Sequence, residues 1–272
     1  MTGLCFRLVQ PPDFALDVSR ILPENMVGIP VDAIRRMRLV HGRRRVMLGD
    51  LFEIDESAED GLAFYGATDK LHSLGSGMSQ GQIRVHGNVG DKLGACMTSG
   101  HIHVLGNAGD YVGSGMRGGT IDIKGNSGDF TGGALPQKPL GMRDGVICVG
   151  KSVGLRAGEY MRRGLLVVNG DAGPYCGSNL IAGTVIVTGH AAQGIGYGMR
   201  RGTILLGHEP QEISVTFNKC GTQPLTFLAL LLRHLRTVNR KAHSRLRSIR
   251  EVRRLTGDIS YGGQGEILIA SQ

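Results

Sequence analysis

Tryptophan is absent from this chain of 272 residues, and aromatic residues make up only 5% of it. Carbohydrate-active enzymes stack sugar rings on aromatic side chains beside a pair of carboxylates, so that class of enzyme is disfavoured. Proteins that bind single-stranded nucleic acids stack bases on aromatic rings, and few aromatic residues lie among the arginines here. The sequence therefore argues against both sugar chemistry and nucleic-acid binding.

Cysteine is scarce and irregularly spaced, and no C-x-x-C pair occurs. The five cysteines are Cys5, Cys96, Cys148, Cys176 and Cys220. An odd, scattered set is typical of a reduced cytosolic protein and does not assemble an iron–sulfur cluster by itself. The longest apolar stretch, residues 225–232, is too short to span a bilayer, and the N-terminus lacks the pattern of a signal peptide. We therefore expect a soluble, cytoplasmic protein that does not contact a membrane.

Positive charge is concentrated in two segments of the chain, whose formal net charge is +8. The first segment holds Arg35, Arg36, Arg38, Arg43, Arg44 and Arg45. The second holds Arg233, Arg236, Arg240, Lys241, Arg245, Arg247, Arg250, Arg253 and Arg254, with Glu251 as its one acidic residue. Runs of this kind attract polyanions or an acidic partner surface.

A methionine followed three residues later by glycine, and then by two alternating apolar residues, recurs along the chain. The copies begin at Met78, Met97, Met116, Met142, Met161, Leu180 and Met199. Successive copies are 19 residues apart, except for one step of 26 residues. A fixed period in this range indicates one structural unit per repeat, stacked on its neighbours.

One repeat, residues 94–112, indicates what each unit builds. Ile102 and Val104 alternate with polar residues as in a half-buried strand, and four glycines mark corners. Such short strands do not form hairpins within a repeat, but they can pair with the equivalent strands of the neighbouring repeats. Leucine-rich, hexapeptide and propeller repeats have other periods or signatures. The sequence predicts a mainly β fold, a parallel β-helix of about seven coils. We expect it to be right-handed, from the preference for right-handed parallel crossovers together with the family resemblance described below.

Two irregularities within the array carry further expectations. Residues 132–140, GGALPQKPL, lengthen one unit, and their prolines cannot join a strand ladder, so we expect a loop that bulges outward. Asparagine recurs in register at 88, 107 and 126, and aspartate at 91, 110 and 129. We interpret both series as turn residues that bond local backbone. A cation site is the alternative for the aspartates, although the dense glycine–aspartate calcium pattern is missing.

The segments outside the repeats should cover the open ends of the stack. Residues 1–70 are predicted to form a small mixed N-terminal cap, with a strand at 4–9, a short helix at 31–37 and a strand-like segment at 46–54. Residues 71–212 hold the Gly-rich repeats, and residues 213–272 a C-terminal strand, a helix and a basic tail.

Within that last region we expect the strand at 213–217, the helix from Pro224 to Arg240, and a tail that is poorly ordered unless a partner holds it. The helix carries an apolar stripe of Phe227, Leu228, Leu231, Leu232 and Leu235. This stripe would either plug the end of the core or dock another protein of the same assembly.

No catalytic constellation is readable, so we assign no catalytic, cofactor-binding or metal-binding residue. His101 and His103 fall on the outer face of one strand, but a metal site needs a third ligand. The Gly-rich elements do not precede a helix, which leaves a phosphate-binding loop unsupported. Arg84 and His103 are interpreted as solvated residues of the outer face.

The repeat pattern G-x-x-M-x-x-G-x-I-x-V-x-G-N-x-G-D resembles the β-helix shared by glutamate synthase C-terminal domains and the C-subunit of formylmethanofuran dehydrogenases. The resemblance covers roughly residues 20–210. The longer unit GGALPQKPLGM at 132–142 and the segment LGDLFEID at 48–55 favour the C-subunit family. Arginine outnumbers lysine, as in GC-rich bacterial genomes, which favours its bacterial branch, the formyltransferase/hydrolase complex.

The resemblance implies a non-catalytic structural and assembly subunit of a cytoplasmic hetero-oligomer in one-carbon metabolism. In methylotrophs this complex takes part in formaldehyde oxidation: it moves a formyl group from formyl-tetrahydromethanopterin to methanofuran and releases formate. The implied partners are an amidohydrolase-type subunit with a zinc-type metal, a formyltransferase-type subunit and a dehydrogenase-like subunit, with no cofactor in this chain. The alternatives are the C-subunit of a molybdenum or tungsten formylmethanofuran dehydrogenase, and a glutamate-synthase-type scaffold domain. The Arg-rich segments would dock acidic partner surfaces or border a route for the glutamate-rich tail of methanofuran.

Overall fold

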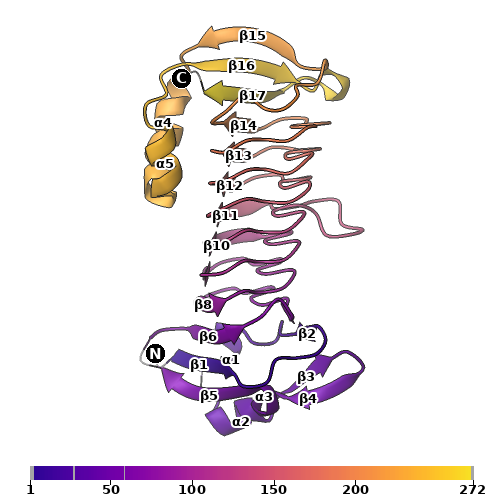
Figure 1. Ribbon diagram of the computed structural model, residues 1–272, viewed down its shortest axis with the longest axis vertical. Coiled ribbons are helices and arrows are strands. Elements are labelled where there is room, and N and C mark those ends of the chain that lie inside the picture. The colour runs from indigo at the N-terminus through magenta and orange to yellow at the C-terminus, as the bar shows by residue number, and fades with distance from the viewer. Residues whose placement is uncertain (1–2, 27, 58, 271–272) are drawn as a thin grey trace.

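The computed structural model describes residues 3–26, 28–57 and 59–270. Within these residues the chain is mainly β, with one sheet of thirteen strands and a second of four. The larger sheet has the order β15-β16-β17-β14-β13-β12-β11-β10-β9-β8-β6-β1-β5, and the smaller has the order β4-β3-β2-β7. The molecule is an elongated stack, with the N-terminal region at one end and the C-terminal region at the other (Figure 1).

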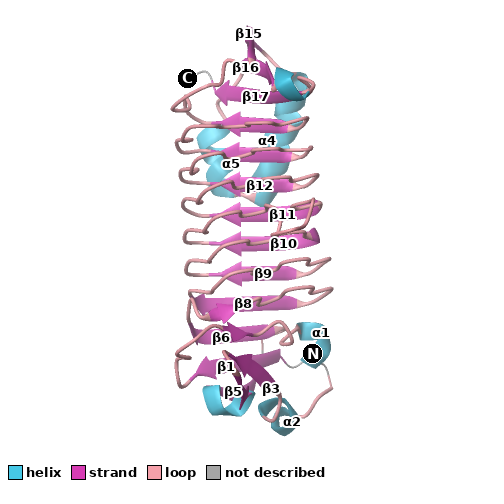
Figure 2. Cartoon of the chain, turned by 90° about the vertical axis from the view of Figure 1, so that its right-hand side faces the viewer, coloured by secondary structure: helices cyan, strands magenta, loops and turns pink. Residues whose placement is uncertain are grey.

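The middle of the large sheet contains one strand from each of the seven repeats, in the order of the sequence (Figure 2). These strands are β8 (Gln82–Gly87), β9 (His101–Val104), β10 (Arg117–Ile123), β11 (Asp144–Val149), β12 (Leu165–Val168), β13 (Thr184–Val187) and β14 (Thr203–Leu206). Every neighbouring pair is parallel, and Ile83 stands opposite Ile102 and Ile102 opposite Ile121. Equivalent residues of consecutive repeats therefore lie side by side.

A second line of contact joins the repeats at the corner after each strand. Parallel bridges connect Val89, Ala108, Ser127, Val153, Ala172 and Ala191 in succession. The predicted apolar positions and the methionines point into one continuous core, and Met78, Met97 and Met116 are each fully buried. The mainly β character and the inward aliphatic positions predicted from the repeat are thus confirmed.

The coupling of methionine and glycine in the motif has a direct steric cause. Gly119 has φ +86°, in the left-handed region that favours glycine. A Cβ added there would lie 2.6 Å from the Met97 methyl carbon of the preceding repeat. Gly145 and Met116 repeat this relation at 2.7 Å. The glycine of each repeat therefore makes room for the methionine of the repeat before it.

The asparagine series forms a ladder of hydrogen bonds between repeats. Asn88 Oδ1 accepts from the Asn107 backbone N–H at 2.9 Å, and Asn107 Oδ1 accepts from the Asn126 N–H at 2.8 Å. The aspartates at 91 and 110 bond in the same manner to the aspartate N–H one repeat further on. The prediction that these side chains bond local backbone is wrong, because each side-chain oxygen accepts a hydrogen bond from the equivalent backbone N–H of the next repeat.

The N-terminal region covers one end of the stack. Its elements are β1 (Gly3–Leu8), β2 (Leu16–Asp17), α1 (Pro23–Met26), α2 (Val31–Arg35), β3 (Arg38–His41), β4 (Arg44–Met47), α3 (Leu48–Leu51), β5 (Phe52–Ser57), β6 (Leu62–Ala67) and β7 (Leu71–His72). Phe6 and Phe64 stack with ring centroids 4.8 Å apart, and Phe52 packs edge-on against both. This aromatic cluster closes the core at the N-terminal end.

The predicted strand at 4–9 and short helix at 31–37 are present with slightly different bounds. The strand-like segment expected at 46–54 is wrong in its middle, where α3 separates β4 from β5. Asp50 Oδ2 accepts a hydrogen bond from the Met47 N–H at 3.1 Å. This bond satisfies a donor at the start of a helical turn, and the local polar contact prevails over the apolar alternation.

The C-terminal region differs most from expectation. Its elements are β15 (Asn218–Gln223), α4 (Thr226–Val238), α5 (Arg240–Leu246), β16 (Val252–Gly257), the 3-10 turn η1 (Ile259–Tyr261) and β17 (Gly265–Ala270). The strand expected at 213–217 begins only at Asn218. The poorly ordered tail is also wrong: β17 pairs parallel with β14, and Ile267 stands opposite Ile204. β16 then pairs antiparallel with β17, so the last strands extend the large sheet and cover its core.

The helices α4 and α5 lie along the outer face of the upper strands (Figure 1). They bury a second apolar layer between helices and sheet. On the sheet this layer contains Cys148, Leu165, Val167, Ile186, Leu205 and Leu268, and on the helices Leu228, Leu232, Leu235, Ala242 and Leu246. The prediction that the apolar stripe of α4 plugs the end of the core is therefore wrong, because the helix covers the side of the stack.

The seven extra residues in one repeat form a loop, as predicted. Residues 136–139 at its tip are exposed, and the loop projects from the stack at the level of β11 (Figure 1). Met142 beyond it is fully buried and returns to the methionine column. The insertion is thus excluded from the stack. Beyond a bulge between Arg117 and Thr120, β10 and β11 pair in the common register, with Ile121 opposite Ile147.

We expect Leu235→Ala to lower the free energy of unfolding by about 2–4 kcal/mol, because Leu235 is fully buried between α4 and the sheet. Leu230→Ala on the same helix is the matched control, since Leu230 is 67% exposed and should change stability by less than about 0.5 kcal/mol. Urea denaturation followed by circular dichroism measures both. Equal effects of the two variants would contradict the buried position of the helix pair.

We expect Asn107→Ala to destabilise the chain by about 0.5–1.5 kcal/mol, because it removes the acceptor of the Asn126 N–H. Asn107→Asp keeps an acceptor oxygen at that position and should lower the free energy of unfolding by less than Asn107→Ala. The same denaturation measurement compares the two variants. If alanine and aspartate were equally tolerated, the ladder would contribute nothing to the joining of repeats.

Candidate functional site

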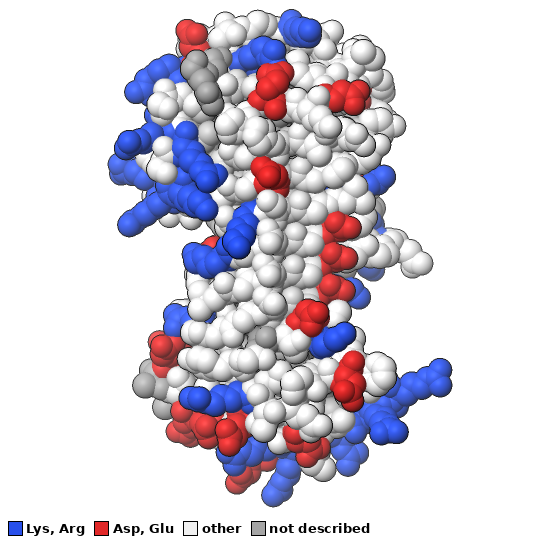
Figure 3. Space-filling model, viewed as in Figure 1, with Lys and Arg blue, Asp and Glu red and all other residues white. Residues whose placement is uncertain are grey.

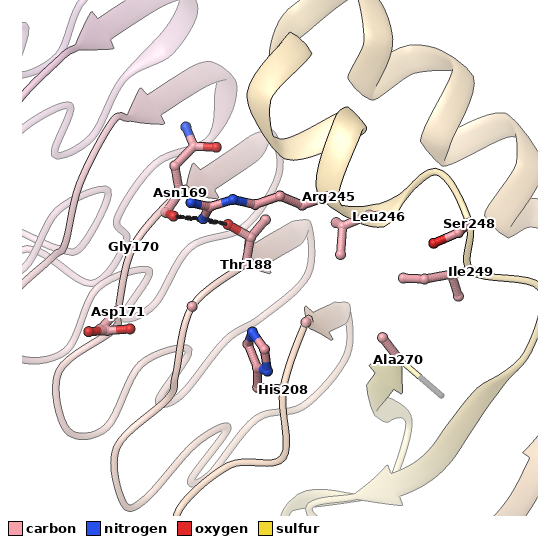
Figure 4. Close-up of a pocket in the computed structure, with 12 residues that line it drawn as sticks. Asn169, Gly170, Asp171, Thr188, His208, Arg245, Leu246, Ser248, Ile249 and Ala270 are labelled. Atoms are coloured by element: carbon pink, nitrogen blue, oxygen red, sulfur yellow. Dashed lines mark hydrogen bonds between the residues drawn. The ribbon is translucent and has the colours of Figure 1, made fainter. Parts of the chain in front are cut away.

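A cavity of about 520 Å³ lies where α5 meets the carboxyl ends of four parallel strands (Figure 4). Asn169 follows β12, Thr188 follows β13, His208 lies two residues beyond β14, and Ala270 ends β17. α5 and the loop after it contribute Arg245, Leu246, Ser248 and Ile249. The stacking of repeats brings strand ends together here, and the turn from α5 to β16 completes the wall.

Arg245 is held across the edge of the stack by neutral acceptors. Its Nη1 donates to the Asn169 backbone oxygen and, at 2.8 Å, to Thr188 Oγ1. Thr188 Oγ1 in turn donates to the Asn169 backbone oxygen at 3.0 Å. Figure 4 shows the guanidinium reaching from α5 to these two strand ends. The two contacts fix the orientation of the guanidinium without neutralising its charge.

Asn169 belongs to the same corner and is almost fully buried. Its Nδ2 donates to the Val149 backbone oxygen at 3.2 Å, whereas its Oδ1 has no hydrogen-bond partner among the described residues. An unpaired buried amide oxygen costs about 1–3 kcal/mol. Within the described residues, the polar network of this corner therefore leaves one buried amide oxygen unpaired.

Two further polar groups line the opposite side of the cavity. The His208 ring stacks on the His190 ring with centroids 4.6 Å apart. Asp171, at the rim, uses Oδ1 to accept from the His190 backbone N–H at 2.8 Å. Among the described residues that line the cavity, the acidic and basic ones are Asp171 and Arg245. The site therefore presents one fixed cation in its wall and one carboxylate at its rim.

His101 and His103, the histidines singled out in the sequence, lie elsewhere, on the outer face of β9. The His103 Nδ1 lies 3.2 Å from Asp122 Oδ2 on the next strand. Burial lowers the pKa of His103, and the nearby Asp122 carboxylate opposes this shift. In the part of the chain that the structure describes, no group of three His, Cys, Asp or Glu side chains is placed to hold a metal ion.

The two basic segments form separate surfaces (Figure 3). In the first segment, the arginines at 43–45 lie at the tip of the β3–β4 hairpin. In the second segment, most of the basic residues lie on α4, α5 and the loop that follows α5. Arg84 is exposed on the outer face, as predicted, and it pairs there with Glu59. Arg253 pairs with Glu209 and Arg254 with Glu266, so the end of the second segment is neutralised by ion pairs.

A column of aromatic residues at one corner was not recognised in the sequence. Tyr111 and Phe130 occupy equivalent positions of consecutive repeats, and their rings stack with centroids 5.0 Å apart. Arg156 follows one repeat later, and its guanidinium lies 5.5 Å from the centroid of Tyr175. All four residues have positive φ. The available signal was the spacing of Tyr111, Phe130, Arg156 and Tyr175, which follows the repeat.

All five cysteines are free thiols. Burial raises the pKa of Cys148 to about 11 and that of Cys176 to about 12. These thiols are therefore inert and serve as small apolar groups of the two core layers. None of the helices in the described residues combines the length and apolarity that a bilayer crossing requires.

Comparison with known proteins first gives the family. The family model described as the GXGXG motif matches residues 67–225, which is more than half of the chain. The matched segment begins just before the first repeat and ends at the start of α4. It therefore contains the whole stack of repeats.

Two curated relatives match shorter segments. The C-subunit of the formyltransferase/hydrolase complex Fhc from Methylorubrum extorquens is 36% identical over 78 residues, 29% of each chain. The C-subunit of the tungsten-containing formylmethanofuran dehydrogenase 2 from Methanothermobacter thermautotrophicus is 33% identical over 85 residues, 29% of this chain and 32% of the relative. The matches thus span only about a third of the length of these relatives.

A solved structure extends the likeness to the whole chain. A chain in the crystal structure of the formyltransferase/hydrolase complex FhcABCD from Methylorubrum extorquens, in complex with methylofuran, superimposes with a TM-score of 0.91. The two chains are 33% identical, and the likeness covers 98% of this chain and 100% of the other. The chain therefore belongs to the GXGXG motif family and is a homologue of the C-subunit of the formyltransferase/hydrolase complex.

Proposed function

We propose that this chain is the structural and assembly subunit of a formyltransferase/hydrolase complex. The observation that carries the proposal is the likeness over 98% of the chain to a component of FhcABCD, which includes the N-terminal region and the helices outside the family motif. Because those parts lie outside the repeats, their structural likeness to the FhcABCD component does not follow from the repeat pattern. The chain would hold an amidohydrolase-type, a formyltransferase-type and a dehydrogenase-like subunit in fixed relation.

The proposed complex moves a formyl group from formyl-tetrahydromethanopterin to methanofuran and releases formate in the cytoplasm of a methylotroph. Methanofuran and tetrahydromethanopterin are then ligands of the complex, and a zinc-type metal belongs to the amidohydrolase-type partner. For this chain we propose no catalytic residue. The stiffness of the stack supports a holding role, because a surface that is already ordered loses little entropy on binding.

The architecture that we propose for this role is a right-handed parallel β-helix of seven coils. Residues 71–212 would form its Gly-rich coils, residues 1–70 its N-terminal cap, and residues 213–272 its C-terminal region. Two lines of parallel pairing, along the strands and at the corner after them, support this architecture. The two basic surfaces, near opposite ends of the stack, would contact acidic partner surfaces.

A second candidate is the C-subunit of a molybdenum- or tungsten-containing formylmethanofuran dehydrogenase. The identity of 36% over 92 residues to the molybdenum-containing enzyme of Methanothermobacter thermautotrophicus favours it. The two candidates differ in the partner subunits and not in the role of this chain. A metallopterin in a co-purified partner would distinguish them.

Co-expression of the tagged chain with the proposed amidohydrolase-type, formyltransferase-type and dehydrogenase-like subunits tests the proposed function. We expect a stable hetero-oligomer on size-exclusion chromatography, and formyltransferase/hydrolase activity that is lost when this chain is omitted. As a control, the chain expressed alone should be folded and should lack deformylase activity. A stable monomer that does not bind the co-expressed subunits, or that hydrolyses the formyl group by itself, would refute the assembly role.

A further inference from the structure

We propose that the cavity beside α5 binds a carboxylate on a short aliphatic stem and that Arg245 anchors it. The inference rests on the cavity alone and is independent of which complex contains the chain. The ligand would enter between α5 and the carboxyl ends of β13, β14 and β17, where Figure 4 shows the cavity between Arg245 and His208.

The guanidinium of Arg245 has N–H donors that its contacts within the described residues do not use. Two of its contacts, both from Nη1, go to the Asn169 backbone oxygen and Thr188 Oγ1. Nη2 and Nε have no hydrogen-bond partner within residues 3–26, 28–57 and 59–270. A guanidinium binds a carboxylate with two parallel N–H donors in its plane. The neutral acceptors on Nη1 thus orient the group and leave one bidentate edge and its full charge available.

The charges that line the cavity favour a single negative charge on the ligand. Among the described residues that line the cavity, Arg245 is the one Lys or Arg, and Asp171 stands at the rim. A phosphate carries close to two negative charges and would need a second cation to offset the repulsion from Asp171. A carboxylate carries one charge, which Arg245 alone can balance.

The rest of the wall suits an aliphatic stem. Leu246 and Ile249 are almost fully buried, and together with Ala270 at the end of β17 they form the apolar part of the wall. The volume of about 520 Å³ lies within the range of small-ligand sites. A chain of two or three methylene groups would lie against this part of the wall while its carboxylate contacts Arg245.

The surroundings of the cavity would draw an anion toward it. Residues 225–250 contain no Asp or Glu, whereas Arg247 and Arg250 are exposed directly after α5. A surface of one sign raises the local concentration of the opposite charge and the rate of encounter. The cavity thus lies within the positive field of the α4–α5 surface.

The same chemistry has two sources, a small free acid or a glutamate side chain of a partner protein. Calorimetric titration of the whole chain uses two probe pairs: butyrate against butyramide, and the peptide acetyl-Gly-Glu-Gly-amide against its glutamine analogue. Binding of butyrate alone identifies a small-acid site, and binding of the Glu peptide alone identifies a side-chain site. Both outcomes support the proposal. The proposal is wrong if neither acid binds with a Kd below about 10 mM, or if the neutral analogues bind as tightly as the acids.

Arg245→Gln and Arg250→Gln test the anchor, since both remove one positive charge from neighbouring positions. We expect Arg245→Gln to weaken acid binding about tenfold or more and Arg250→Gln to weaken it less than about twofold. Equal losses would show a non-specific charge effect and overturn the proposal.

Arg245→Lys is the second variant, in case the glutamine variant fails to fold. Lysine keeps the positive charge but lacks the two parallel N–H donors of the guanidinium. We therefore expect several-fold weaker binding of the acids and an unchanged melting temperature. If the lysine variant bound the acids as tightly as the natural chain, the bidentate anchor would be refuted.

Discussion

Hydrogen bonding between equivalent positions of consecutive repeats is the interaction on which the rest of this structure depends. Each strand of four to seven residues is too short to be stable alone, and its N–H and C=O groups are satisfied only by the repeats on either side. The asparagine and aspartate ladders apply the same rule to side chains. Because the bonds of these ladders join equivalent residues of consecutive repeats, the period is constrained. The 26-residue unit confirms the constraint, since its extra residues leave the stack and Met142 still falls in the column.

The parts of the fold that repeat could be predicted from the sequence, because seven copies distinguish a structural requirement from chance. The inward apolar positions, the methionine column and the outward loop all follow from comparing copies. The C-terminal region has no such internal comparison. β17 joins β14 only after the chain has formed β15, two helices and β16, and nothing in a local window relates Ile267 to Ile204. A basic, glycine-containing segment by itself therefore predicts a tail.

One overlooked signal did point to the helix pair. In β8, β9 and β10 the outward residues between the two core positions are Arg84, His103 and Asp122, as in a strand with one solvated face. In the next four repeats the equivalent positions are Cys148, Val167, Ile186 and Leu205, all buried. A strand that is apolar on both faces needs a covering layer. The candidate cavity was less accessible, because Arg245 meets Asn169 and Thr188 only once α5 lies on the sheet.

The helix pair also explains why a defined cavity occurs in a fold of otherwise regular faces. Along β8 to β10 the outer face is open and its charges pair with one another, as Lys124 does with Asp122. Where α5 ends against the strand ends, the regular surface is interrupted and a guanidinium is held in a corner whose backbone is fixed by two neighbouring repeats. Affinity for a small anion depends on such prior ordering, because a flexible surface arginine loses its entropy on binding. The stack thus supplies a rigid backbone, and the non-repeating helix α5 supplies the arginine side chain. A site of this kind requires both.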